Sequence, residues 1–168
     1  MTSTTALHHP PRKPRRDRNA RVLRAIALLA AVLSLLAQPA QAQLSERFGP
    51  YELHYSVVNT TFIEPAVAAQ YGLARGDRRA IINLSLREHL DDGSTVAREM
   101  DLTGESWDLT QSRIDFDFIK VIEGPAIYYI GEFKFINREW RFFDVSFSPA
   151  NSDARYQFDF KQQMYIND

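Results

Sequence analysis

One stretch, residues 126–136, constrains the fold more than any other part of this chain. It reads Ala-Ile-Tyr-Tyr-Ile-Gly-Glu-Phe-Lys-Phe-Ile and is rich in β-branched and aromatic residues. Taken with a period of two, one face carries Ile127, Tyr129, Gly131, Phe133 and Phe135. The opposite face is also apolar at first, through Ala126, Tyr128 and Ile130, and then turns polar. Because a strand with one face in water should alternate cleanly, we predict a central strand of a small all-β core.

Six further segments show the period-two alternation of strands. They are residues 51–58, 80–89, 95–104, 113–123, 140–148 and 155–165. Turn residues such as those of 91–94 (Asp-Asp-Gly-Ser) and Gly124-Pro125 separate them. Residues 64–72 indicate a short helix, with Pro65 near its first position and Gly72 at its end. We therefore expect an all-β fold: an antiparallel β-sandwich of immunoglobulin-like architecture, with about seven strands and one short helix between the first and second.

Three local expectations complete this prediction. Residues 43–47 should be a polar lead-in to the first strand. Residues 105–112 should form a loop that Trp107 and Leu109 hold against the core. The central strand should pair with the strand that begins at Trp140, because a short turn at residues 137–139 joins the two.

The first 42 residues read as a secretory signal peptide. Seven basic residues precede an apolar run from Ala25 to Ala37, and Ala40-Gln41-Ala42 ends the segment. A basic region, a short apolar region and a small-x-small end are the three parts of such a signal. The apolar run is shorter than the roughly 18–20 residues that span a bilayer. We expect cleavage after Ala42, a single mature domain over residues 43–168, location in the periplasm, and no stable membrane insertion of the mature chain.

The charge of the mature domain differs from that of the whole chain. The chain as a whole carries a net charge of −1. Without the seven basic residues and Asp17 of the leader, 13 basic and 20 acidic residues remain, for a net charge of −7. An acidic domain repels phosphate backbones, so nucleic acid is not an expected partner. The chain has no cysteine, which excludes disulfides, thiolate nucleophiles and cysteine-ligated metals.

Two regions of the mature chain resemble a known family. Residues 47–65, followed by Val67-Ala68 and Tyr71-Gly72, and residues 123–130 resemble small exported proteins of Gram-negative bacteria grouped as the domain of unknown function family 4426. The most specific positions are Phe48, Gly49, Tyr51, His54, Tyr55, Thr61 and Phe62. Ser56 stands where members commonly have Asn. The resemblance covers essentially the whole mature chain and implies a periplasmic β-rich domain. It implies no activity, cofactor or catalytic residue.

The titratable residues form no catalytic constellation in the sequence. His54 and His89 are the histidines that remain after cleavage, and nothing in their spacing forces them to meet, so we read them as polar residues of strand faces. Asp115 and Asp117 share a strand face, which paired carboxylates need for acid–base work, but we interpret them as a solvated face that also discourages edge pairing. The sequence has no Gly-x-Ser-x-Gly elbow and no phosphate-binding glycine loop. We expect no catalytic residue, no metal and no cofactor.

Residues 59–79 are the place where we look for function. This connection is long for a tight β-fold, and long loops often carry binding residues. The candidate binding residues are His54, Tyr71, Arg75, Arg78 and Arg79, since an arginine cluster on an acidic protein can bind an anionic group. Alternatively, residues 59–79 have a structural role only. The helix then plugs one open end of the sandwich, and the arginines pair with nearby carboxylates.

Two functions are open from the sequence. The first is a non-catalytic binding or interaction module of the cell envelope, which recognises a protein or peptide by a sheet edge or by the helical loop. The alternative is a small periplasmic enzyme or enzyme accessory with a site around His54, Tyr71 and Arg78. The enzyme requires those three side chains to converge in one pocket.

Overall fold

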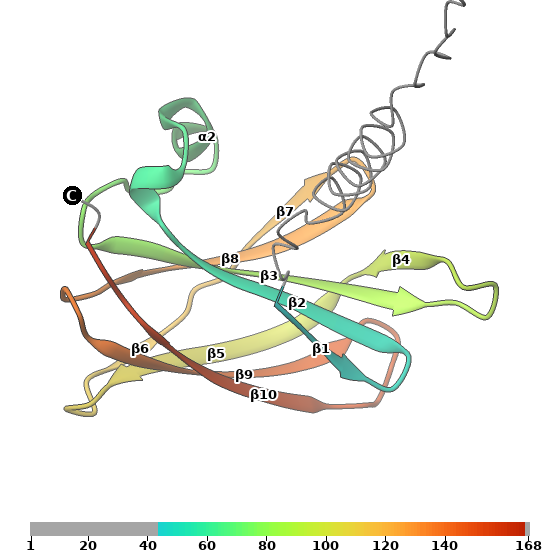
Figure 1. Cartoon of the computed structure of the whole chain (residues 1–168). Coiled ribbons are helices and arrows are strands. Elements are labelled where there is room, and N and C mark those ends of the chain that lie inside the picture. The colour runs from blue at the N-terminus through green and yellow to red at the C-terminus, as the bar shows by residue number, and fades with distance from the viewer. Residues whose placement is uncertain (1–43, 167–168) are drawn as a thin grey trace, which may run out of the picture. The chain divides into compact units, whose positions relative to one another are not determined.

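The computed structural model describes residues 44–166, which form two antiparallel sheets packed face to face (Figure 1). The expected leader, residues 1–42, and its cleavage point after Ala42 lie outside the described residues. Within residues 44–166, no helix has the length and apolar character needed to cross a membrane.

The larger sheet has six strands. Its main order is β1-β2-β3-β8-β7, and β4 pairs with β3 beyond the end of β8. The bounds are β1 Ser45–Phe48, β2 Tyr51–Asn59, β3 Arg79–His89, β4 Thr95–Arg98, β7 Ile119–Glu123 and β8 Ala126–Lys134. A 3₁₀ turn, η1 (Thr60–Phe62), and one helix, α2 (Pro65–Gln70), connect β2 to β3.

The smaller sheet has four strands in the order β10-β9-β5-β6. The bounds are β5 Met100–Asp108, β6 Arg113–Asp115, β9 Trp140–Pro149 and β10 Tyr156–Gln163. The predicted antiparallel sandwich with one short helix is therefore confirmed. One added strand, β1, and two divided strands account for ten strands in place of about seven.

The core lies between the sheets and is largely aromatic. Alternate residues of β9 point into it, and Phe143 and Val145 are fully buried. Phe143 stacks on Phe160, with 4.5 Å between ring centroids. Full burial of a Phe or Val side chain contributes roughly 1.5–3 kcal/mol, so a cysteine-free domain of this size can be held by such a core.

The central stretch is β8, and both of its faces are apolar as predicted. Tyr129 and Phe133 lie in the core between the sheets, whereas Ile130 packs on the outer face beneath α2. The predicted pairing with the strand from Trp140 is wrong, since β8 pairs with β3 and β7, and β9 pairs with β10 and β5. The chain crosses from one sheet to the other after β8, so the short turn joins strands in different layers.

Two predicted strands are each divided by a crossing between the sheets. The segment 95–104 becomes β4 in the larger sheet and β5 in the smaller one, and the segment 113–123 becomes β6 and β7 in the same way. Phe116 and Phe118 lie at the second crossing and contact the core. Ile122 keeps the inner face, opposite Ile127 of β8, but it is 59% exposed because β7 is an edge strand. Val121 is buried on the outer face, beneath the helical segment.

The other two local expectations are also corrected. The lead-in at 43–47 contains β1, which pairs with β2 through Ser45 opposite His54. The expected loop 105–112 is strand as far as Asp108, and Trp107 stacks on Phe142 on the outer face of the smaller sheet. Leu109 is 68% exposed and holds nothing against the core.

One charged side chain lies at an inward position of β9. Arg141 alternates with Phe143 and Val145 and is 3% exposed. It donates hydrogen bonds from Nε to Glu139 Oε1 and from Nη1 to Ser106 Oγ, each 3.1 Å long. A buried charge is tolerated only where it is paired and hydrogen-bonded in this way.

Candidate functional site

Residues 59–79 lie on the outer face of the larger sheet, above β3, β8 and β7. Ala68 of α2 and Leu73 are buried there against Ile81, Val121 and Ile130. Pro65 occupies the first turn of the helix and Gly72 ends it with a φ of 68°, a conformation that glycine adopts without strain. The expectation that the helix plugs an open end of the sandwich is therefore wrong, because its apolar face covers an outer sheet face.

A fixed set of hydrogen bonds closes this segment on itself. The buried Thr60 hydroxyl accepts from the Gly76 N–H at 3.0 Å and lies 3.2 Å from the carbonyl oxygens of Gly76 and Arg79. Arg75 donates to the carbonyl oxygens of Thr60 and Thr61 at 3.2 and 3.0 Å. Arg75 thus caps backbone carbonyls and pairs with no carboxylate of residues 44–166.

Tyr71 is engaged within the protein. Its hydroxyl donates a hydrogen bond to Glu123 Oε1, and this bond, with partial desolvation, raises the pKa of Tyr71 above its ordinary value. Close by, the Ala74 N–H donates to Glu132 Oε1 at 2.7 Å. These two carboxylates of β7 and β8 tie the segment to the sheet.

Arg78 and Arg79 are the candidates that remain available. Arg78 is exposed, and its carbonyl accepts from the Phe135 N–H at 3.1 Å. Arg79 begins β3 opposite Lys134. Neither guanidinium makes a hydrogen bond or ion pair with residues of the range 44–166. Both can therefore meet an external anion.

The structure does not bring His54, Tyr71 and Arg78 together. His54 lies on β2, whereas the Glu123 partner of Tyr71 lies on β7, three strands or about 14 Å across the sheet. Along β8, Glu123 aligns with Ala126 and Arg78 with Phe135, which is roughly 30 Å of strand. The enzyme alternative required one shared pocket and is not carried further.

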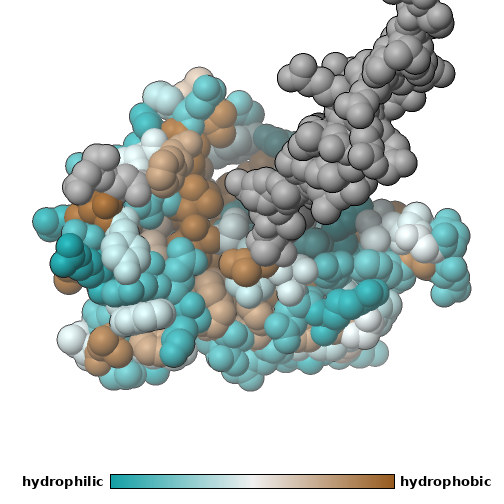
Figure 2. Space-filling view, viewed as in Figure 1, coloured by the Kyte–Doolittle hydropathy of each residue, from teal (hydrophilic) through white to brown (hydrophobic). Residues whose placement is uncertain are grey.

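A groove lies instead between the end of β2 and the end of β10, and we call it the β2–β10 groove. Its volume is about 330 Å³, and its lining is Val57, Val58, Asn59, Phe62, Gln162, Gln163, Met164 and Tyr165. Phe62 is 70% exposed and Tyr165 is 52% exposed. The Asn59 side-chain amide donates to the Tyr165 carbonyl at 2.7 Å and joins the two walls. Figure 2 shows hydrophobic surface between the helical segment and the smaller sheet.

Both walls of this groove are sheet edges. β10 pairs with β9 alone, and β1 pairs with β2 only as far as His54. Beyond His54, the Tyr55 N–H donates to the Leu44 carbonyl at 2.9 Å, on the β1 side of β2. Successive residues of a strand direct their N–H and C=O groups to opposite sides. The N–H and C=O of Val57, two residues after Tyr55, therefore also point to the β1 side. Within the described residues no strand pairs with Val57 at that edge.

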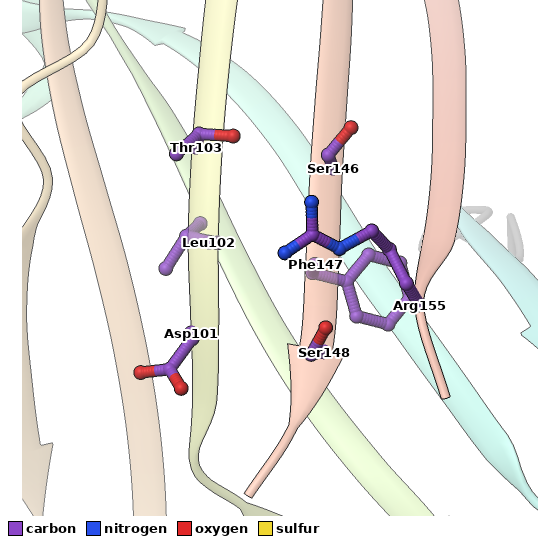
Figure 3. A pocket seen from close by; sticks show the side chains of 7 residues that line it. All are labelled: Asp101, Leu102, Thr103, Ser146, Phe147, Ser148 and Arg155. Atoms are coloured by element: carbon purple, nitrogen blue, oxygen red, sulfur yellow. The ribbon is translucent and has the colours of Figure 1, made fainter. Parts of the chain in front are cut away.

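A second hollow lies on the outer face of the smaller sheet (Figure 3). The Arg155 side chain extends across the strand that carries Ser146 and Ser148, and Asp101 lies on the neighbouring strand. Its volume is about 140 Å³, less than half that of the β2–β10 groove. It offers neither an exposed aromatic side chain nor an open strand edge.

Glu52, His54 and His89 form a polar cluster on the outer face of the larger sheet. Glu52 Oε2 lies 2.7 Å from His89 Nε2, and Glu52 Oε1 lies 3.8 Å from His54 Nε2. Ser45 donates to Glu52 Oε1 at 2.7 Å. The hydrogen bond from Ser45, followed by that from His89, lowers the pKa of Glu52. The two histidines, which the sequence left unrelated, therefore face one carboxylate.

The groove residues escaped the sequence analysis for a clear reason. Phe62 was visible as an aromatic residue in the long connection, but Tyr165 lies 103 positions later and was assigned to a strand. The signal in the sequence was Phe62 itself, a large apolar side chain in a loop that is not needed to fill the core. Tyr165 lies across the groove only because the end of the chain folds back beside β2.

A family model and solved structures relate the chain to known proteins. A family model described as "Domain of unknown function (DUF4426)" matches residues 45–167. A crystal structure of a DUF4426 family protein, PA0388 of Pseudomonas aeruginosa, is 30% identical, with a TM-score of 0.65 over 77% of this chain and 99% of that one. No curated protein matches the sequence.

The fold recurs at lower identity in FetP of uropathogenic Escherichia coli. FetP expressed in the periplasm is 8% identical, with a TM-score of 0.54 over 76% of this chain and 96% of that one. A copper-bound variant of FetP gives the same identity and score over 75% and 97%. At this identity the likeness concerns the fold alone.

Proposed function

Since this chain belongs to the DUF4426 family, whose function is not assigned, we propose a function from its own geometry: it is an exported, periplasmic binding module that captures an extended segment of an envelope protein in the β2–β10 groove. Capture occurs by strand addition to the open edge of β2. The leader-like residues 1–42 support export, since they combine a basic region, an apolar run and a small-x-small end.

The observation that carries this proposal is the coincidence of an open edge with apolar walls. In strand addition, main-chain hydrogen bonds supply affinity and side-chain pockets supply specificity. The Val57 N–H and C=O supply the first, and Phe62 and Tyr165 supply the second. Exposed strand edges are normally blocked by charge or proline, and this one carries neither.

The charges near the groove define the partner further. Asn59 pairs with Ala80, so Arg78 and Arg79 lie at the same end of the sheet as the groove, one strand away. Their guanidinium groups, which pair with no side chain of residues 44–166, suit a carboxylate of the partner. The occupant we propose is an extended segment with alternate apolar side chains and an acidic residue near one end.

Site-specific photocrosslinking in cells tests the proposal. A photoreactive amino acid replaces Phe62 in one variant and Leu109 in a matched control, because these side chains are 70% and 68% exposed. We expect discrete adducts from position 62 that are absent at 109, with the crosslinked peptide drawn from one segment of the partner. Equal adducts at both positions, or none at 62, would contradict the proposal.

A backbone variant tests the strand-addition step. Val57→Pro removes an N–H that points to the open edge and leaves the bonds from β2 to β3 in place. We expect loss of the adduct in a variant that still unfolds cooperatively. A Val57→Ala control removes side-chain packing but keeps the N–H, so it should retain the adduct. Retention by Val57→Pro would refute strand addition.

A further inference from the structure

The Glu52–His54–His89 cluster contains a histidine whose hydrogen-bonding capacity is unused. His54 Nδ1 is buried without a hydrogen-bond partner, and Nε2 lies 3.8 Å from Glu52 Oε1, beyond hydrogen-bonding distance. Buried polar atoms nearly always have partners, so each exception needs an explanation. Among the described residues, the other such atom is Asn83 Oδ1, on β3 of the same sheet face.

The backbone holds the three side chains on one face. Glu52 and His54 are two residues apart on β2, so both point outward while Leu53 points into the core. His89 ends β3, and its N–H donates to the Pro50 carbonyl at 2.8 Å. The side chains are 18–27% exposed, which leaves the cluster reachable from solvent.

We propose that His54 Nε2, His89 Nε2 and the Glu52 carboxylate bind one divalent transition-metal ion, of the class of Cu²⁺ or Zn²⁺. Two imidazoles with one carboxylate suit these ions, and water completes the coordination. Each imidazole binds through Nε2 in its neutral form, and ligation gives a partner to His54 Nε2, which makes no hydrogen bond with residues 44–166.

The distances agree with a site that closes on the ion. Ligands at about 2.0–2.1 Å with tetrahedral angles place neighbouring donor atoms about 3.3 Å apart. The two observed N···O separations, 2.7 and 3.8 Å, lie on either side of that value. No three His, Asp or Glu side chains of residues 44–166 are yet arranged around a common point. Shifts of about half an ångström, within rotamer freedom, are therefore part of binding.

Ser45 supplies the outer support that such sites use. Its hydroxyl donates to Glu52 Oε1 at 2.7 Å and fixes the carboxylate from β1. Partners of this kind orient a ligand and typically contribute 10–100-fold in metal affinity. Ser45→Ala should therefore weaken binding about tenfold, which is a smaller effect than the loss of a histidine.

Titration of the metal-free protein with Cu²⁺ alone tests the site, by calorimetry and electron paramagnetic resonance. We expect one equivalent to bind, with hyperfine structure from two imidazole nitrogens. His54→Asn and His89→Asn should each lower the affinity more than tenfold, and Glu52→Gln should also lower it. The ion should raise the melting temperature of the wild type but not of these variants.

Glu99→Gln provides the matched control, because the Glu99 carboxylate is 48% exposed and pairs with Lys120 outside the cluster. This variant should bind Cu²⁺ like the wild type. Unchanged binding by folded His54→Asn and His89→Asn variants, or loss of binding in the control, would overturn the proposal. Absence of binding by the wild type would do the same.

Discussion

Arg141 and Glu139 form an ion pair at the edge of the core, and we expect removal of either charge to lower the free energy of unfolding. The side chains are 4% and 12% exposed, and the Nε–Oε1 separation is 3.1 Å. Breaking a buried pair by removing one partner costs about 3–5 kcal/mol, because the other charge is left uncompensated. In Glu139→Gln, Arg141 keeps its bond to Ser106 and its position 5.7 Å from the Phe133 ring, so we expect a loss of about 2–3 kcal/mol.

Equilibrium unfolding in urea measures this loss as a lower midpoint at unchanged slope. For a domain of this size, it corresponds to a fall in melting temperature of about 10 °C. The matched control is Glu99→Gln, because Glu99 pairs with Lys120 at 3.2 Å while both side chains are nearly half exposed. An exposed pair contributes about 0–1 kcal/mol, so the control should unfold close to the wild type.

A double-mutant cycle separates the pair from its surroundings. Arg141→Met removes the charge and keeps much of the apolar stem, and Glu139 can then turn toward water. We expect Arg141→Met to cost less in the Glu139→Gln background than in the wild type, with a coupling of about 1–3 kcal/mol. Additive effects, or a loss below about 0.5 kcal/mol in Glu139→Gln, would refute this account of the pair.

Four further predictions concern the central strand and the chain start. Gly131→Ala places a Cβ 3.0 Å from a ring carbon of Phe116, so overpacking should cost about 1–3 kcal/mol in urea unfolding, and an unchanged midpoint would contradict it. Tyr129→Phe leaves the buried Met100 N–H without its 2.9 Å acceptor and should cost about 1–3 kcal/mol. Since burial raises the pKa of Tyr129, wild-type stability should fall as pH rises above about 10, where the unfolded tyrosine ionises first, and the decline should be shallower in Tyr129→Phe. Mass spectrometry of exported protein should find Gln43 at the amino terminus, and an intact leader would contradict the predicted cleavage.

The strands and the helix were largely predictable, because their signals are local. Pro65 and Gly72 bracket a short alanine-rich segment, and the helix lies between them. In the sequence, Tyr128 and Ile130 indicated a second buried face on β8, and α2 covers that face in the structure. The candidate site was less predictable. The guanidinium groups of Arg78 and Arg79 pair with no side chain of residues 44–166, whereas Arg75 and Tyr71 are engaged by backbone carbonyls and by Glu123, which lie far from them in the sequence.

Alternation and turn chemistry act over a few neighbouring residues, so the fold class, the order of most elements and the two-faced character of residues 126–136 follow from the sequence. The folded structure was needed to show that β8 pairs with β3 and β7, and that segments 95–104 and 113–123 each cross between sheets. The folded structure also places Phe62 and Tyr165 in the lining of one groove and two histidines beside Glu52. These features depend on contacts between residues far apart in the chain, and period-two alternation is the same whichever sheet a strand joins.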